Sequence, residues 1–145
     1  MIKFIDDNSN EFNYFKTIGW NLKNIENQFS KNNNYSIGYY EADKLAGVLI
    51  GDTIKNDNAY DLELHILFVS KDLRRKKIAT KLLNYIETNN VNFSKIFIEV
   101  AEDNVEAINF YQKNNFVFLN FRHNYYRYNK KNIHAKCFIK KINHE

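Results

Sequence analysis

Apolar and polar positions along the chain follow two periods, and each period predicts one type of element. Runs rich in β-branched and aromatic residues between polar turns predict strands. Apolar residues three and four positions apart predict helices. The expected strands are 2–5, 35–41, 45–54, 60–69, 95–100, 116–121 and 133–142, and the expected helices are 8–16, 22–29, 77–87 and 105–113. This order predicts one α+β domain over residues 1–145, with a mixed, mostly antiparallel sheet of about six to seven strands and about four helices.

The junction between the strand 60–69 and the helix 77–87 carries the first chemical signal. Four consecutive cations, Arg74 to Lys77, stand where the helix begins. A helix N-terminus offers unpaired backbone N–H groups and the positive end of the helix dipole. Together with the cations, it predicts a site for a multiply charged anion such as a pyrophosphate. The plain alternative is a solvated basic turn.

Composition narrows the class of protein. With 44% hydrophobic and 16% aromatic residues, the chain can bury a core, and a net charge of +4 does not indicate a dedicated nucleic-acid binder. The single cysteine, Cys137, excludes an internal disulfide framework and a multi-cysteine metal site. No apolar run approaches the roughly 18 residues of a membrane span, and residues 1–7 lack the apolar segment of a signal peptide. We therefore expect a cytoplasmic protein that does not enter membranes.

A second constellation follows the strand 95–100. Asn104 is a good helix N-cap, because its side chain can accept a hydrogen bond from the first turn. Together with the basic junction, this region resembles the GNAT superfamily of acyl-CoA-dependent N-acetyltransferases. Arg74-Arg75-Lys76-Lys77-Ile78-Ala79 resembles its Gln/Arg-x-x-Gly-x-Gly/Ala pyrophosphate loop. The residues that match its Asn-x-x-Ala-x-x-Phe-Tyr-x-x-x-Gly-Phe segment are Asn104, Ala107, Phe110, Tyr111 and Phe116. The resemblance covers roughly residues 64–126.

Two positions depart from the family pattern. Asn115 replaces the glycine before Phe116, and asparagine is the next-best residue for a left-handed helix C-cap. Lys77 replaces the loop glycine, which lets the backbone approach a phosphate closely. We expect acyl-CoA binding to be kept but weakened by Lys77.

Within the superfamily, the sequence resembles most the ribosomal-protein alanine N-acetyltransferases. The matching residues are Ile98-Glu99-Val100, Tyr111 and Arg122-His123-Asn124-Tyr125-Tyr126. The resemblance implies that Glu99 is the general base and Tyr111 the general acid. It also implies acetyl-CoA as co-substrate and no metal. The residues expected to bind acetyl-CoA are Leu67, Phe68 and Val69 at the thioester, Arg74, Arg75, Lys76, Lys77, Ile78, Ala79 and Thr80 at the pyrophosphate, and Asn104 at the pantetheine arm.

The chemistry of amide formation supports these roles. An amine must lose its proton before it attacks a thioester, and a free α-amino group has a pKa of about 8 against about 10.4 for lysine. A carboxylate base that works through water is therefore adequate, and an N-terminal amine is the easier nucleophile. A backbone N–H among residues 67–69 would meet the oxyanion. No covalent intermediate is required, which agrees with the large separation along the chain between Cys137 and both motifs.

Each candidate also has a purely structural interpretation. Glu99 could be a strand carboxylate that faces water or a lysine, and Tyr111 could be a core residue of an amphipathic helix. We do not expect His65, His123 or His134 to act as a base or a ligand. Five residues near the C-terminus fit either an acceptor groove or an edge strand with aromatic cross-strand pairs. They are Arg122, Tyr125, Tyr126, Arg127 and Tyr128.

The favoured hypothesis is an acetyl-CoA-dependent N-acetyltransferase that acts by direct attack of an amine. Its expected partners are acetyl-CoA and an amine acceptor, first of all the N-terminal alanine of a ribosomal protein, and we expect no nucleic acid. The alternatives are acetylation of a small amine, a noncatalytic RNA-binding domain, and a CoA-binding protein without activity. An acidic acceptor pocket would favour cationic small molecules, and a groove of peptide width would favour an N-terminus.

Overall fold

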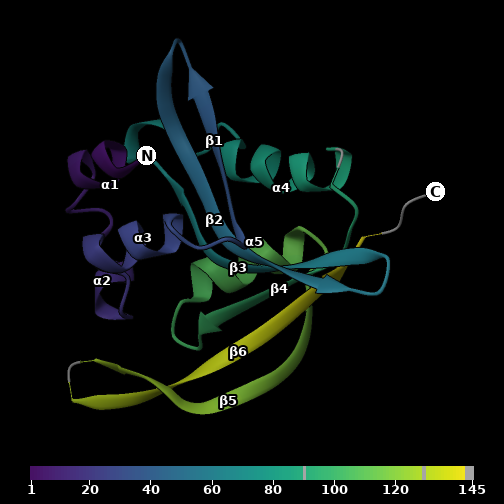
Figure 1. Ribbon diagram of the computed structural model, residues 1–145. Helices are drawn as coiled ribbons and strands as arrows, with labels where there is room; N and C mark the ends of the chain where they lie inside the picture. Colours follow the sequence, from purple (N-terminus) through teal and green to yellow (C-terminus); the bar gives the residue numbers. More distant parts are fainter. Residues whose placement is uncertain (90, 129, 143–145) are drawn as a thin grey trace.

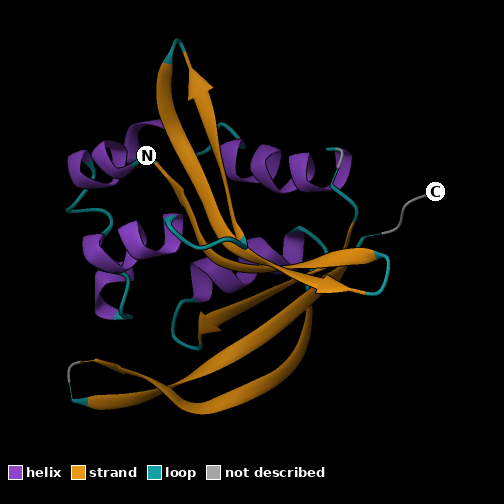
Figure 2. Cartoon of the chain, viewed as in Figure 1, coloured by secondary structure: helices purple, strands orange, loops and turns teal. Residues whose placement is uncertain are grey.

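In the part of the chain that the structure describes, six strands form one sheet, and helices pack against it (Figures 1 and 2). The computed structural model describes residues 1–89, 91–128 and 130–142. In these ranges the helices are α1 (Ile2–Asp7), α2 (Asn13–Thr17), α3 (Leu22–Phe29), the 3-10 helix η1 (Lys71–Leu73), α4 (Ile78–Thr88) and α5 (Val105–Lys113). The strands are β1 (Asn34–Glu41), β2 (Lys44–Asn56), β3 (Ala59–Val69), β4 (Phe93–Ala101), β5 (Val117–Tyr128) and β6 (Lys131–Lys141).

The strand order in the sheet is β1-β2-β3-β4-β6-β5. β3 and β4 are parallel, as their connection through a helix requires. The other four neighbouring pairs are antiparallel. The prediction of a mixed, mostly antiparallel sheet in an α+β fold is therefore confirmed.

Helices cover both faces of the sheet (Figure 1). Leu83 of α4 and Ile108 of α5 belong to the larger hydrophobic core. Along β2, Leu49 belongs to that core, whereas Val48 and Ile50 pack with α1 and α3 in a second core. Successive strand residues point to opposite faces, so the two cores lie on opposite sides of β2. No helix in the described part of the chain combines the length and hydropathy of a membrane span.

The N-terminal region differs from the prediction. Residues 2–5 form helix α1 instead of a strand, because the helix buries Phe4 against α3 and the Asn8 side chain donates to the Phe4 carbonyl at 2.8 Å near its end. A short apolar run is ambiguous between the two periods. The expected helix 8–16 is shorter, since turns fill its first half and α2 begins only after Phe12, which is fully buried.

β3 and β4 are paired only over their N-terminal parts. The last residues in register are Leu64 of β3 and Ile98 of β4, and beyond them no pair between the two strands is present among the described residues. His65 and Glu99 are the first residues past this point. The two strands therefore open a wedge in the sheet, with His65 on one side and Glu99 on the other.

A β-bulge in the β2–β3 pair lies where β3 and β4 begin to separate. The register skips His65 where β2 passes from Ile50 to Gly51. A Cβ atom on Gly51 would lie 2.4 Å from the carbonyl oxygen of Glu63, so the close approach of the strands requires glycine. Buried side chains before and after the bulge point to different cores. The bulge therefore changes the face of the sheet to which the following side chains of β3 point.

Both ends of α5 follow the prediction. The Asn104 side chain accepts a hydrogen bond from the Ala107 N–H at 3.2 Å and caps the helix. Asn115 follows the helix with a left-handed φ of 68°. The next strand, β5, continues to Tyr128, beyond the expected end at residue 121, because it forms a long hairpin with β6 at the edge of the sheet.

Candidate active site

The basic segment Arg74–Lys77 connects η1 to α4, and its side chains are exposed. Arg74 Nε donates to the carbonyl oxygen of Val69 at 3.2 Å, and Lys76 Nζ pairs with a carboxylate of β1 at 3.4 Å. Within the described residues, no side chain caps the start of α4. The loop therefore places four cations beside an uncapped helix N-terminus, an arrangement that attracts phosphate groups.

The backbone conformation of the loop explains why the family pattern has glycine at the position of Lys77. Lys77 has a φ of 59° and Arg75 a φ of 69°, both in the left-handed region. This conformation costs a residue with a side chain roughly 1–2 kcal/mol, and glycine adopts it without that cost. The fold thus keeps the left-handed turn even though Lys77 occupies it.

A cavity of about 1480 Å³ lies along the wedge between β3 and β4. Its walls include every site residue expected from the sequence except Lys76, whose side chain pairs with β1 instead. The expected residues in the wall are Leu67, Phe68, Val69, Arg74, Arg75, Lys77, Ile78, Ala79, Thr80, Glu99, Asn104 and Tyr111. The fold brings the two sequence motifs to one cavity.

Glu99 lies on the β4 side of the wedge. Its side chain is 27% exposed, and its Oε1 accepts a hydrogen bond from Arg122 Nη1 of β5 at 2.5 Å. The Arg122 guanidinium also lies 4.0 Å from the centre of the Tyr125 ring. A carboxylate in this position can accept a proton through its second oxygen or after the ion pair with Arg122 opens.

Cys137 lies directly beside Glu99, which corrects the expectation that it is remote from the motifs. The β4–β6 register pairs the two residues, and Cys137 also borders the cavity. Burial, and in smaller part the Glu99 charge, raise the pKa of the Cys137 thiol. A thiol that stays protonated is a poor nucleophile. The proximity therefore gives no support to a covalent mechanism.

Tyr111 of α5 borders the cavity from within the core. It is only 6% exposed and packs edge-on against Phe116 at a ring distance of 5.2 Å. Burial, and in smaller part the neighbouring Tyr14, raise its pKa above the ordinary value for tyrosine. Tyr111 therefore keeps its O–H proton and can donate a hydrogen bond. The alternative interpretation of Tyr111 as a core residue also holds, since its ring is part of the larger hydrophobic core.

The β5–β6 hairpin and α2 border the end of the cavity that lies away from the basic loop. Tyr126 packs in a small core with Tyr14 and Ile18, and Arg122 and Tyr125 border the cavity beside it. β5 is the edge strand of the sheet. The region is therefore both an edge strand and a border of the cavity, so each of the two interpretations holds in part. The side chain of Tyr128 lies outside the part of the chain that the structure describes.

One group of cavity residues received no site role from the sequence, and His65 among them was expected to be neither a base nor a ligand. Glu63 and His65 of β3 and Trp20, which follows α2, line the same end of the cavity. The Trp20 indole packs on the His65 ring at 5.1 Å. Gly51 inside a strand was a usable signal, since glycine there suggests a bulge. The sequence did not indicate which side chain that bulge would present.

Comparison with known proteins agrees with this geometry. The sequence model of the acetyltransferase (GNAT) family matches residues 3–116. The fold is similar to NAA60 from Arabidopsis thaliana in complex with a bisubstrate analogue, with a TM-score of 0.72 and 17% identity over 92% of this chain and 90% of that one. A search of curated proteins finds no match.

Two further solved structures have a similar fold. The ribosomal-protein-S18-alanine N-acetyltransferase from Escherichia coli has a TM-score of 0.72 and 20% identity, over 87% of this chain and 79% of that one. An aminoglycoside 6′-N-acetyltransferase complexed with coenzyme A has a TM-score of 0.66 and 16% identity, over 86% and 81%. At these identities the likeness concerns the fold, and acceptors differ among the similar proteins.

Proposed function

Because the chain belongs to the GNAT acetyltransferase family, we propose that it acetylates the N-terminal amine of a protein, with an N-terminal alanine of a ribosomal protein as the favoured acceptor. The chain is an acetyltransferase whose acyl donor is acetyl-CoA. The observation that carries the proposal is the wedge between β3 and β4, whose cavity is bordered both by the basic loop before α4 and by Glu99, Arg122 and Tyr125.

Acetyl-CoA would lie along the wedge. Its pyrophosphate would bind the cations and N–H groups of the loop Arg74–Thr80, with Asn104 beside the pantetheine arm. Strand β3 pairs with β2 on one side, so its unpaired side past Leu64 offers backbone groups to the thioester. A backbone N–H from residues 67–69 would stabilise the oxyanion of the tetrahedral intermediate.

Glu99 would remove the proton of the attacking amine, directly or through water. Tyr111 would donate its O–H to the departing thiolate. Full proton transfer from a buried phenol to a thiolate is uphill, because a free thiol has a pKa of about 8.5 and the pKa of Tyr111 is raised. The role proposed for Tyr111 is therefore chiefly hydrogen-bond donation to the sulfur.

Two features support a peptide acceptor. The hairpin and α2 form an extended aromatic wall beside Glu99, and an α-amino group is easier to deprotonate than a lysine side chain. A cationic small molecule is the second candidate. Glu11, Glu63 and Glu99 all border the cavity, and an aminoglycoside N-acetyltransferase has a similar fold.

The first test is thermal unfolding with acetyl-CoA. A ligand at 100 times its Kd adds about 2.7 kcal/mol to the free energy of unfolding. We expect an upward shift of the melting midpoint, and no shift at millimolar acetyl-CoA would contradict the proposal.

The second test identifies the acceptor by mass spectrometry. The protein and acetyl-CoA are incubated with a peptide that begins with alanine, with the same peptide blocked at its N-terminus, and with a linear polyamine. We expect acetylation of the first peptide alone. Acetylation of the polyamine alone would favour the small-molecule alternative.

A further inference from the structure

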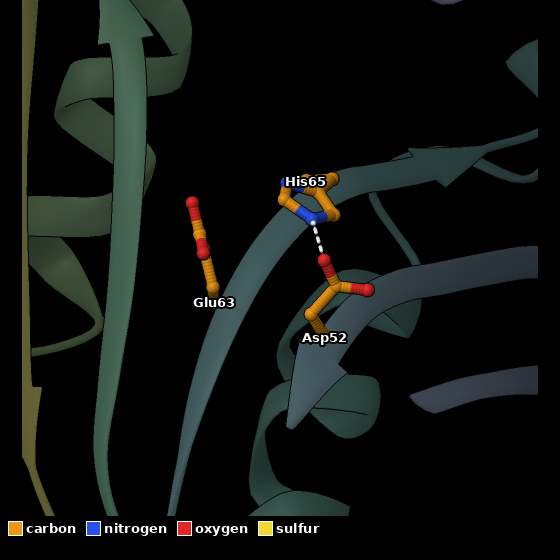
Figure 3. Close-up of side chains that lie close together, drawn as sticks. All are labelled: Asp52, Glu63 and His65. Atoms are coloured by element: carbon orange, nitrogen blue, oxygen red, sulfur yellow. Dashed lines mark hydrogen bonds and ion pairs between the residues drawn. The ribbon is translucent and has the colours of Figure 1, made fainter. Parts of the chain in front are cut away.

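His65 is held in one orientation at the wedge. Its Nε2 lies 3.0 Å from Asp52 Oδ2 of β2, and the Trp20 ring packs against it (Figure 3). Its side chain is 18% exposed, and the residue borders the cavity. As the extra residue of the β3 bulge, it is directed by the backbone as well as by its contacts.

Asp52 determines which nitrogen of His65 carries the proton. Its side chain is 9% exposed, and burial alone would raise the pKa of the Asp52 carboxyl. Hydrogen bonds from Gln28, His65 and Lys31 outweigh burial, so the pKa of Asp52 lies below its usual value. An ionised carboxylate only accepts hydrogen bonds. His65 Nε2 therefore carries the hydrogen, and Nδ1 has the free lone pair of the neutral ring.

The cluster of Asp52, Glu63 and His65 has the composition of a metal site, since one ligand atom of each lies within 4.8 Å of the others. Lys31 argues against this interpretation. Its Nζ lies 2.9 Å from Asp52 Oδ2, the same oxygen that His65 contacts. A divalent cation would have to displace an ammonium group that already compensates the charge. The cluster is a network that fixes His65.

From this geometry we infer that His65 Nδ1 is a proton acceptor for the acceptor amine, on the opposite side of the wedge from Glu99, with Asp52 as its positioning residue. The inference rests on the proposed function. Asp52 would orient the imidazole and stabilise the imidazolium, the role of a carboxylate behind a catalytic histidine. Figure 3 shows the Nδ1 edge of the ring turned to the side where Glu63 lies.

Three charged side chains lie around the His65 ring. Asp52 and Glu63 face it with two carboxylates, and Lys31 contributes one ammonium group. The contact with Asp52 occupies Nε2 of the ring and leaves Nδ1 as the site for a proton. Glu99 already accepts a hydrogen bond from the Arg122 guanidinium on one of its oxygens.

The step balances without a further reactant. The amine nitrogen forms a bond to the thioester carbonyl carbon, and the carbon–sulfur bond breaks. The protonated amine gives one proton to Glu99 before it attacks, as proposed above, and the second proton, which the nitrogen loses on attack, goes to His65 Nδ1, directly or through one water. The thiolate leaves with the sulfur electron pair and is protonated from solvent, and His65 later returns its proton to solvent.

The test compares His65→Gln with the wild type and with His123→Gln as a control. The glutamine Nε2 can keep the hydrogen bond to Asp52 but offers no imidazole lone pair. His123 lies on the exposed β5 strand beside the Phe121 ring. We expect kcat of His65→Gln to fall about 100-fold or more, with an unchanged melting shift by acetyl-CoA. His123→Gln should behave as the wild type.

A second variant, His65→Ala, is assayed with added imidazole. A free imidazole that enters the vacated space should restore a measurable part of kcat, which a purely structural loss would not allow. An activity of His65→Gln within threefold of the wild type would overturn the inference, and so would a loss of its acetyl-CoA shift. A wild-type protein that acetylates no amine would instead overturn the proposed function, and the inference with it.

Discussion

Lys77 is one of the two positions at which this chain departs from the family pattern, and its backbone conformation shows a cost of the departure. The left-handed φ of 59° is unfavourable for lysine and natural for glycine. Lys77 also borders the cavity, where in the proposed binding mode a phosphate would approach the backbone. The strain of the left-handed backbone and the bulk of the lysine side chain therefore offset any gain in phosphate binding from the fourth cation.

Lys77→Gly should stabilise the protein by about 0.5–1 kcal/mol, because relief of roughly 1–2 kcal/mol of strain exceeds the added entropy of the unfolded chain. The measurement is urea unfolding. Lys76→Gly is the matched control, since Lys76 has no left-handed φ in the structure, and it should be destabilised. The Kd for acetyl-CoA should fall in Lys77→Gly. Equal destabilisation of both variants would contradict this account.

Tyr111→Phe separates a chemical role from a packing role at one residue. The phenylalanine ring keeps the contact with Phe116, so the free energy of unfolding should change by no more than about 0.5 kcal/mol. Loss of the O–H should lower kcat by about 10-fold to 100-fold and leave the acetyl-CoA melting shift in place. Steady-state kinetics and thermal unfolding measure the two effects. Unchanged kcat would assign Tyr111 to the core alone.

At the scale of elements, sequence periodicity predicted most of the sheet and both helices next to the motifs. It failed at residues 2–5, where a short apolar run fits either period and the packing against α3 decides. It also placed Cys137 far from Glu99, since strand pairing across the sheet is not encoded by local spacing. The opening between β3 and β4 and the bulge at His65 are consequences of register, which no single stretch determines.

The network around Asp52 links three elements, β2, β3 and the end of α3, and its stability should depend on pH. The folded-state pKa of Asp52 is lowered, so its contribution is fully present above the unfolded value of about 3.9 and is lost as pH falls further. Urea unfolding between pH 6 and 3 should show a steeper loss of stability for the wild type than for Asp52→Asn. At pH 6 the variant should be less stable by about 1–3 kcal/mol. Parallel curves would contradict the role of this carboxylate.

At the scale of the whole molecule, the wedge divides the sheet into two parts. β1, β2 and β3 with α1, α3 and α4 form one side, β4, β6 and β5 with α5 form the other, and α2 packs against both. Past Leu64 and Ile98 the two parts are held apart, and a ligand in the wedge would contact both. Binding of acetyl-CoA should therefore couple them.

Hydrogen exchange can detect this coupling. In the free protein, amides of β3 that face the wedge lack a strand partner on β4, so peptides that cover residues 65–69 should exchange faster than those of the β1–β2 hairpin. Acetyl-CoA should slow exchange in residues 65–69 and at the start of α4, where the loop would bind the pyrophosphate. The β1–β2 hairpin provides the internal control. Protection confined to the β5–β6 hairpin would place the ligand outside the wedge and contradict the binding mode proposed for it.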